Sequence, residues 1–257
     1  MKLKRILKGF FVTVGILFLL AAIAVGGCIL FYSYEKRQQV PAKAVVLSEE
    51  EKTAIAYEEN LSYIMEKKDD YEFIVVLNPA HGGPDAGKES AYGKEKDIVL
   101  AICKQVMADN TEPDIGIFVT RADDVAMDDA MRLAFLEQVQ PDVFIDVHLN
   151  KDETASSYGT SVYYSTSYYN RKLTNAEFAD IMEQSVVSAI EGFACGIFSA
   201  EREEMQIIEG LQIPAVSIAC GDLSNEKEAQ LLATNPYQKN VAKGILKGIV
   251  KAKKKLD

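Results

Sequence analysis

The stretch FIVVL at residues 73–77 runs directly into the loop NPAHGG at residues 78–83. Five apolar residues in a row, without polar alternation, are typical of a strand that is buried on both faces of a sheet. A second stretch, VFIDV at residues 143–147, leads in a similar way into His148. These two stretches predict central strands of a sheet that helices cover on both faces.

Outward from these strands, strand and helix patterns alternate up to the C-terminus. We expect strands at residues 73–77, 115–119, 143–147, 159–164, 205–208 and 215–218, and helices at residues 96–108, 128–139, 173–191 and 240–255. This alternation predicts a single α/β domain over residues 71–257, with a central, mostly parallel or mixed sheet flanked by helices.

Residues 36–70 are predicted to be a linker followed by a helix. Ser48 and Glu51 have the spacing of a capping box, and apolar residues recur at helical spacing up to about Lys67. This helix is expected either to form a stalk or to dock on the domain.

The first 35 residues have the pattern of a membrane anchor. An uncharged run covers residues 9–34, and about 20 apolar residues suffice to cross a hydrocarbon core. Four basic residues precede this run: Lys2, Lys4, Arg5 and Lys8. The charges predict a single-pass transmembrane helix in the cell membrane, with its N-terminus inside and the soluble domain outside the cytoplasm. A lipoprotein signal that ends at Cys28 and a cleaved signal peptide are the two alternatives.

The charge of the chain argues against nucleic acid as a partner. The formal net charge is −10, and six of the 28 basic residues precede residue 41, so the predicted domain is more acidic still. Such a domain repels a phosphate backbone.

Beyond the predicted anchor, Cys103, Cys195 and Cys220 form neither a disulfide framework nor a zinc ribbon, and we expect buried free thiols. The oligomeric state cannot be read from the sequence.

The chain has two histidines, and each follows a predicted strand. His81 and His148 should therefore lie at the sheet edge where α/β proteins bind ligands. Glu95 opens the helix after the first loop and can turn back toward the same edge. Two imidazoles and one carboxylate leave zinc a fourth position, as a catalytic site requires. Taken singly, a histidine at a strand end is more often a hydrogen-bonded core or loop residue, and the combination of the three residues is the stronger signal.

Five ordered segments between about residue 73 and residue 250 resemble the zinc-dependent N-acetylmuramoyl-L-alanine amidases of the amidase type 3 family. The segment NPAHGGPDAG at residues 78–87 resembles the family's DPGHGGxDxG, and EKDIVL at residues 95–100 matches its EKDIVL. The segment VTRADD at residues 119–124 resembles LTRxxD, and Arg132 falls where the family's next helix carries arginine. The segments DVFIDVHLN at residues 142–150 and PAVSIACGDLSN at residues 214–225 resemble DLFISIHAN and PAVLVExGFLSN.

The resemblance implies that His81, Glu95 and His148 bind one Zn²⁺ per chain. It also implies peptidoglycan as the substrate, with hydrolysis of the amide between N-acetylmuramic acid and the L-alanine of the stem peptide during cell-wall turnover. Zinc would polarise the carbonyl and activate water, with a nearby carboxylate handling the proton.

This chain departs from the family pattern at the proton-handling position. Ala219 stands where the family has its catalytic glutamate, and an alanine side chain cannot transfer a proton. Asp146 replaces the family's serine two residues before the second histidine, and period-two alternation puts it on the same strand face as His148. We interpret Asp146 as a substitute general base, or alternatively as a support for His148. Asp222 and Glu209 are looser candidates for the same task.

The leading hypothesis is therefore a zinc-dependent peptidoglycan amidase that lacks the usual catalytic glutamate. A second hypothesis is a zinc-retaining pseudoenzyme that acts as a peptidoglycan-binding or regulatory module. A third is a metallohydrolase that acts on another amide.

Overall fold

The computed structural model of the protein describes residues 25–27, 47–150, 158–200 and 206–257. The chain divides into two units, Met1–Leu47 and Ser48–Asp257. The predicted membrane anchor belongs to the first unit and lies outside the described residues, apart from the helical residues 25–27. Within the described part of the chain, none of the helices has both the length and the apolar character that a membrane crossing requires.

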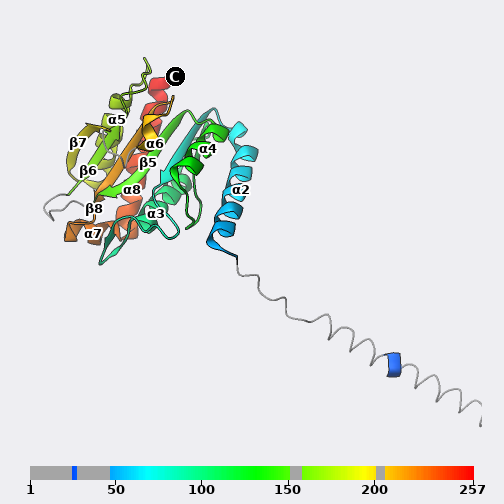
Figure 1. Ribbon diagram of the computed structural model, residues 1–257. Coiled ribbons are helices and arrows are strands. Elements are labelled where there is room, and N and C mark those ends of the chain that lie inside the picture. The colour runs from blue at the N-terminus through cyan, green and yellow to red at the C-terminus, as the bar shows by residue number, and fades with distance from the viewer. Residues whose placement is uncertain (1–24, 28–46, 151–157, 201–205) are drawn as a thin grey trace, which may run out of the picture. The chain divides into compact units, whose positions relative to one another are not determined.

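A six-stranded sheet with the order β4-β1-β5-β8-β6-β7 forms the centre of the second unit (Figure 1). Its strands are β1 (Phe73–Pro79), β4 (Ile115–Val119), β5 (Val143–Asn150), β6 (Thr160–Tyr164), β7 (Ala194–Ser199) and β8 (Ala215–Asp222). β6 runs antiparallel to β8, whereas the other neighbouring pairs are parallel. The predicted α/β domain with a mostly parallel, mixed sheet is confirmed.

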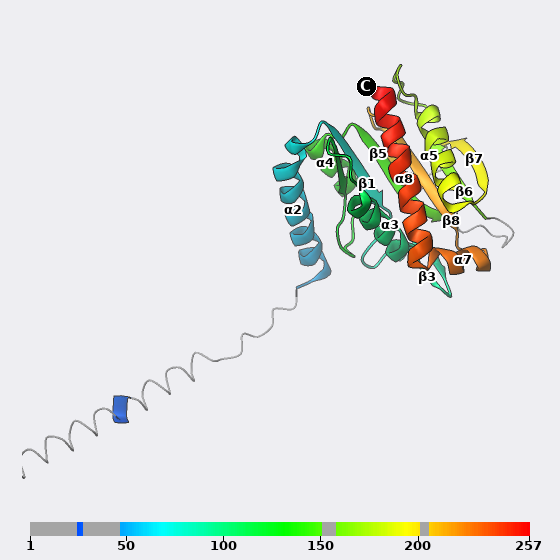
Figure 2. The same cartoon turned by 180° about the vertical axis from the view of Figure 1, so that it is seen from behind.

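One face of the sheet is covered by α3 (Glu95–Asp109), α5 (Asn175–Ile190) and α8 (Asn235–Leu256), which Figure 2 shows from behind. α8 turns Val241, Ile245 and Ile249 toward the sheet, and all three are fully buried. Burial of each such side chain stabilises the fold by about 1.5–3 kcal/mol. This face is the larger part of the hydrophobic core.

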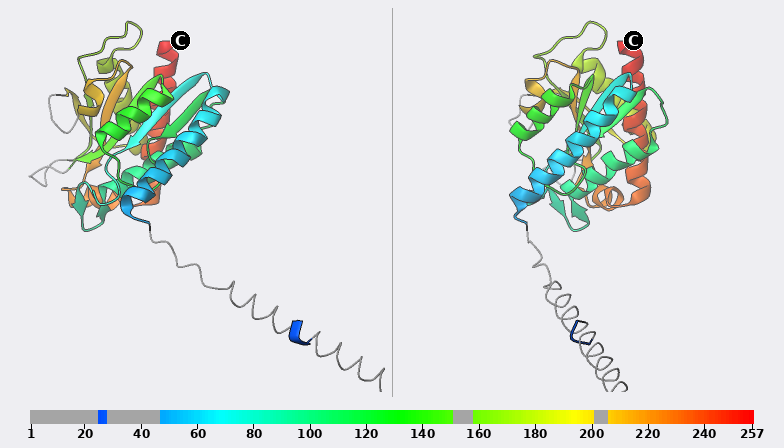
Figure 3. Two further views of the ribbon diagram at one scale, coloured as in Figure 1. Left: turned by 45° about the vertical axis from the view of Figure 1, so that its right-hand side comes forward. Right: turned by 90° about the vertical axis from the view of Figure 1, so that its right-hand side faces the viewer.

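The other face is covered by α2 (Glu49–Lys67), α4 (Asp129–Val139) and α6 (Gln206–Glu209), and Figure 3 shows α2 and α4 in front of the strands. The predicted capping box is present, because the side chain of Ser48 accepts from the backbone N–H of Glu51 and the Glu51 carboxylate accepts from that of Ser48.

α2 is docked on the domain. Its Leu61 and Ile64 are buried in the same cluster as Phe135 of α4. Its Asn60 donates from Nδ2 to the carbonyl oxygens of Val119 and Thr120, at 2.8 and 3.1 Å. These contacts match a docked helix, which was one of the two expectations for this segment.

Two local expectations are wrong, and one strand was not predicted. Residues 206–209 form α6 instead of a strand at 205–208, since a short apolar pair such as Ile207 and Ile208 fits either element. β7 was not expected, and it forms an edge of the sheet, where Cys195 is exposed. Burial of the free thiols therefore holds for Cys103 and Cys220 only.

The remaining short elements are a 3₁₀ turn at Lys68–Asp70, the two-stranded ribbon of β2 (Glu89–Ser90) and β3 (Gly93–Lys94), and α7 (Glu226–Leu232).

Candidate metal centre

His81 lies in the loop after β1 with a φ of 60°. A left-handed conformation is uncommon for a residue other than glycine, and it persists only where the surrounding structure enforces it. Gly82 follows with a φ of 132°, and a Cβ atom there would lie 2.3 Å from the carbonyl oxygen of Val125. The glycine lets the loop pass that close to the neighbouring backbone, and the loop presents the imidazole at the carboxyl end of β1.

Arg121 ties the histidine loop to the start of α3. Its side chain is buried, and it donates hydrogen bonds to the carbonyl oxygens of Pro79 and Ala80, both at 3.0 Å. It also donates to the carbonyl oxygen of Lys96 at 2.9 Å. Because Lys96 follows Glu95, one guanidinium group holds the backbone next to both His81 and Glu95.

Glu95 is fully buried at the first position of α3 and joins three segments. Its Oε2 accepts from the backbone N–H of Lys88 and its Oε1 from that of Leu149, both at 2.8 Å. Nε2 of His81 lies 3.2 Å from Oε2, and Nδ1 of His148 lies 3.2 Å from Oε1. The three side chains that the sequence predicts as metal ligands therefore come together.

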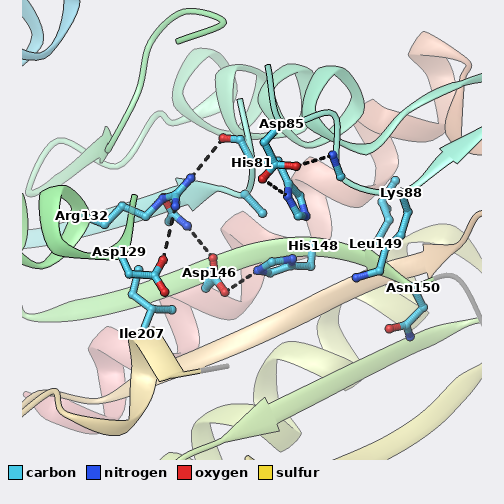
Figure 4. A pocket seen from close by; sticks show the side chains of 13 residues that line it. His81, Asp85, Lys88, Asp129, Arg132, Asp146, His148, Leu149, Asn150 and Ile207 are labelled. Atoms are coloured by element: carbon cyan, nitrogen blue, oxygen red, sulfur yellow. Dashed lines mark hydrogen bonds and ion pairs between the residues drawn. The ribbon is translucent and has the colours of Figure 1, made fainter. Parts of the chain in front are cut away.

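Each imidazole has an aspartate at its other nitrogen (Figure 4). Nδ1 of His81 lies 2.7 Å from Oδ2 of Asp85, and Nε2 of His148 lies 2.7 Å from Oδ2 of Asp146. A carboxylate on the far nitrogen is the common way to fix the tautomer and orientation of a metal-binding histidine. It leaves Nε2 of His81 and Nδ1 of His148 facing Glu95.

The spacing and chemistry of this trio fit a divalent metal such as zinc. One ligand atom from each side chain lies within 4.8 Å of the other two. Two ligand atoms bound to zinc at about 2.0–2.1 Å in a tetrahedron lie roughly 3.3 Å apart, close to the separations seen here. The buried Nε2 of His81 makes no hydrogen bond within the described residues, although Oε2 of Glu95 is only 3.2 Å away. A metal ion would satisfy this atom.

The charges of the trio shift the pKa values of all three side chains. Burial by itself lowers the pKa of His148, but the charges of Asp146 and Glu95 outweigh burial and raise the pKa to about 10. Burial likewise opposes the rise in the pKa of His81, which Glu95 and Asp85 cause. Burial favours a high pKa for Glu95, yet the nearby imidazoles of His148 and His81 bring that pKa well below its usual value. These directions describe a carboxylate whose charge the two neighbouring imidazoles stabilise.

A cavity of about 420 Å³ opens beside the trio and is lined by His81, His148 and polar side chains of β1, the loop after β1, α4 and β5. Arg132 borders it from α4, donating from Nη2 to the carbonyl oxygen of His81 at 3.1 Å. Nη1 of Arg132 also lies 3.4 Å from Oδ1 of Asp129. Lys88 adds a second cation to the lining. The cavity can therefore accommodate a polar substrate beside the metal ligands.

The candidate carboxylates for proton transfer separate into two groups. Asp146 is fully buried and contacts His148 directly. Asp222 ends β8 with its Oδ1 bound to the Ser224 hydroxyl, and Glu209 is exposed at the end of α6. Within the described part of the chain, neither Asp222 nor Glu209 lines the cavity. Asp146 is thus the one of the three that meets the metal centre.

The comparisons with known proteins agree with this architecture. The model of the N-acetylmuramoyl-L-alanine amidase family matches residues 75–251. The chain belongs to this family. The matched residues extend from β1 into α8, so they contain the sheet and the candidate metal centre of this amidase-family domain.

Relatives and solved structures carry the same family name. A germination-specific N-acetylmuramoyl-L-alanine amidase of Bacillus subtilis (strain 168) is 26% identical over 193 residues, which cover 69% of this chain and 78% of that protein. The catalytic domain of CwlV, an N-acetylmuramoyl-L-alanine amidase from Bacillus (Paenibacillus) polymyxa var. colistinus, is 28% identical with a TM-score of 0.63, covering 70% of this chain and 97% of the other. An N-acetylmuramoyl-L-alanine amidase from Clostridium difficile 630 is 26% identical with a TM-score of 0.65, covering 71% and 96%.

Sequence reasoning leaves the parts played by Asp85, Arg121 and Asn78 unassigned. Asp85 could have been found, because a carboxylate four residues after a histidine in a glycine-rich loop can fold back onto the ring. The hydrogen bonds of Arg121 could not be predicted, because they depend on how the histidine loop and the start of α3 lie relative to each other. The contact of Asn78 with Asp146 requires the register of β1 against β5, which the sequence alone does not give.

Proposed function

We propose that this protein is a zinc-dependent amidase that hydrolyses the bond between N-acetylmuramic acid and the L-alanine of the peptidoglycan stem peptide. The observation that carries the proposal is the clustering of His81, Glu95 and His148 at the sheet edge of an amidase-family domain. These three side chains would hold one zinc ion, and the open cavity beside them leaves room for substrate.

Zinc would supply Lewis-acid chemistry, by polarising the amide carbonyl and lowering the pKa of water. The protein's own residues keep the ligand atoms in place. Asp85 and Asp146 orient the two imidazoles, and Arg121 fixes the backbone on which His81 and Glu95 stand. Because the ligand atoms are already held in place, the site could bind a metal ion without rearranging its loops.

Proton transfer is the weak point of the site, because the methyl group of Ala219 cannot accept a proton. Loss of a general base lowers the rate by roughly 10²–10⁴-fold while the metal site persists. The substitute base suggested by the sequence, Asp146, has both carboxylate oxygens engaged by Asn78, Ser217 and His148. Those contacts favour the supporting role for Asp146, so we propose slow hydrolysis.

The second candidate function is a zinc-retaining module that binds peptidoglycan without cleaving it. Ala219 is the observation that favours it, since the ligand set serves both functions. The two candidates predict the same zinc content and the same retention on cell wall, and they differ only in product formation.

The deciding experiment follows product release from purified peptidoglycan by the zinc-loaded full chain. Mass spectrometry would identify stem peptides with a free N-terminal L-alanine. We expect slow release by the wild type and none by the double variant His81→Ala, His148→Ala. Zinc content and retention on insoluble peptidoglycan would be measured on the same samples.

The outcomes separate the candidates. Release that is equal in the wild type and the double variant would reject the amidase. Zinc and retention without release would favour the binding module. A wild type without zinc would reject both, because each depends on the metal site.

We further propose that the protein is anchored in the cell membrane with its domain outside the cytoplasm. The basic residues before the uncharged run at residues 9–34 support this topology. Protease added to intact protoplasts should remove the domain and spare cytosolic markers, and full protection of the domain would reject the topology.

A further inference from the structure

The helix α8 concentrates positive charge on an acidic protein. It carries seven of the chain's 28 basic residues and no acidic residue, whereas the chain has 38 acidic residues. Four of its lysines recur at every fourth position and are exposed, and we call them the lysine row: Lys239, Lys243, Lys247 and Lys251. This spacing puts them on one side of the helix, away from its buried face. Figure 2 shows α8 in front of the sheet.

The lysine row costs the helix stability in the free protein. Like charges four positions apart on a helix repel each other. Basic residues stabilise the last turn of a helix, where they face the negative end of its dipole, and this accounts for the lysines at residues 253–255. Lys239 and Lys243 lie in the first half of α8, outside the reach of that effect. The helix dipole therefore does not explain the row.

The domain supplies anions to the end of α8 but not to most of the row. Nζ of Lys253 lies 2.9 Å from Oδ2 of Asp114. Within the described residues, no hydrogen bond or ion pair engages three lysines of the row, Lys239, Lys243 and Lys247. Their ammonium groups can therefore bind an anion from outside the chain.

The row starts at the end of the domain that carries the candidate metal centre. α8 follows α7, which follows β8, and Figure 2 shows the start of α8 at the same end as β3, which directly precedes Glu95. From Lys239 to Lys251 the row extends about 18 Å, at a helical rise of about 1.5 Å per residue. Successive charges are roughly 6 Å apart along the helix axis. A line of cations with this spacing suits a chain-like polyanion.

An anionic membrane surface fits the row less well than a polymer does. α5 packs beside α8 and exposes Glu177 and Asp180. A flat surface laid along α8 also faces these acidic groups, whereas a slender polymer can contact the row alone. Charges in water interact over only about 8 Å at physiological salt, so the acidic remainder of the domain does not cancel such a contact.

We propose that the lysine row is a docking surface for peptidoglycan, at which the ammonium groups bind carboxylates of the stem peptides. Stem peptides repeat along each glycan strand and carry free carboxylates, so the polymer offers a series of anions to a series of cations. The inference deepens the proposed function, on which the choice of polymer rests. It involves neither the metal ligands nor the cavity, and it gives the domain a second contact with the wall.

The experiment measures retention of the full chain on purified peptidoglycan, in detergent and with a chelator present. Acid treatment first removes phosphate-containing polymers from the wall. The row variant replaces three lysines by a neutral residue of good helix propensity: Lys239→Gln, Lys243→Gln and Lys247→Gln. The control variant removes the same charge from half-exposed lysines of α2 and α3: Lys52→Gln, Lys67→Gln and Lys104→Gln.

We expect the dissociation constant of the row variant to be about tenfold above that of the wild type, because exposed ion pairs are individually weak. The control variant should stay within about twofold of the wild type. Added salt should weaken the wild type and reduce the difference. Conversion of the wall's carboxylates to amides should bring the wild type to the level of the row variant. The row variant should melt no lower than the wild type, since it loses like-charge repulsion.

Three results would overturn the proposal. Equal retention of the wild type and the row variant would reject the docking surface, and an equal loss in the row and control variants would reduce the effect to net charge. Wild-type retention that survives amidation, or that needs the phosphate-containing polymers, would reject the assigned partner. Protection of α8 from hydrogen exchange by anionic nanodiscs, without a difference in retention on the wall, would assign the row to the membrane instead.

Two further measurements separate this inference from its surroundings. If the row variant melts below the wild type, the single variants Lys239→Gln and Lys243→Gln replace it, and retention equal to the wild type in both overturns the row. Because a chelator is present, retention does not depend on zinc. A wild type that binds no zinc, yet loses retention in the row variant, rejects the proposed amidase and supports the row.

Discussion

Ala219 of β8 and His148 of β5 are direct partners across the sheet, so their side chains project from the same face. Ala219 is 1% exposed, so its methyl group is buried on this face. A longer side chain at this position would extend toward the metal centre from its own strand. The register therefore explains why position 219 is suited to a proton-transferring group and why its loss leaves the ligands in place.

Replacement of Ala219 by Glu should restore a carboxylate beside His148. We expect hydrolysis of purified peptidoglycan to accelerate by roughly 10²–10⁴-fold, the usual contribution of a positioned general base. Zinc content should stay at the wild-type level, because none of the three ligands changes. The rate of stem-peptide release, measured at equal zinc loading, checks this expectation.

Ala219→Gln is the matched control, since glutamine has the same size and cannot accept the proton at neutral pH. Any gain that comes from packing or substrate contact alone would be present in both variants. Equal rates for the two variants, or an Ala219→Glu protein no faster than the wild type at normal melting temperature, would contradict the general-base explanation.

Glu95→Gln should reduce the zinc content from about one per chain to nearly none, because an open catalytic site has only three protein ligands. The amide can still accept a backbone hydrogen bond from Lys88 or Leu149, so the fold should persist. Metal analysis after gel filtration provides the measurement. Asp129→Asn changes a carboxylate that lines the adjoining cavity and should keep its zinc, and loss of zinc in both variants would argue against the assigned ligands.

Zinc affinity should rise with pH across the neutral range. In the metal-free protein the pKa of His148 is raised from 6.5 to about 10, with burial opposing and Asp146 and Glu95 causing the rise. The ring is therefore charged at pH 7, and zinc must displace its proton. Titration calorimetry in buffers of different ionisation enthalpy would count the protons released, and binding without proton release would contradict the charged state.

The same shift gives the sign of a stability effect in the metal-free protein. A raised pKa stabilises the folded state fully below the unfolded value of 6.5 and loses that contribution as pH rises toward about 10. The metal-free melting temperature should therefore fall over this interval. Zinc-loaded protein should lack this fall, since its imidazoles carry no proton on the ligand atoms.

The central strands and the three metal-ligand candidates could be predicted because both depend on local patterns. Apolar runs mark β1 and β5, and each run leads into a histidine. Parallel neighbours bring their carboxyl ends to one edge, which is enough to bring His81 and His148 together. Glu95 follows from the start of the next helix. The edge strand β7 has no comparable signal, because its sequence ACGIFS is short and only half-buried.

The function of Asp146 could not be derived from the sequence for a different reason. Its alternation with His148 is a property of one strand, whereas its partners Asn78 and Ser217 are set by the register of three strands. Register depends on the packing of the whole sheet. A carboxylate two residues from a ligand therefore indicates proximity, and only the cross-strand contacts distinguish support of the ring from proton transfer.

Gly87→Ala should damage the metal centre more than it damages the fold. Gly87 has a φ of 65°, and a Cβ atom there would lie 2.4 Å from Cδ2 of His81 and 2.7 Å from Oε2 of Glu95. One added methyl group would thus press on two of the three ligands at once. A non-glycine residue in this conformation costs about 1–2 kcal/mol, or roughly 2–8 °C in melting temperature for a domain of this size.

We expect zinc binding by Gly87→Ala to weaken at least as much as it does when a supporting residue is removed, about 10–100-fold. Gly93→Ala is the matched control, because its Cβ atom would meet the flexible end of Ile98 at 3.3 Å and its φ is not left-handed. Chelator competition on both variants measures the difference. A folded Gly87→Ala protein with wild-type zinc affinity would contradict the assignment of His81 and Glu95 as metal ligands. The added carbon atom would force both side chains out of their present positions.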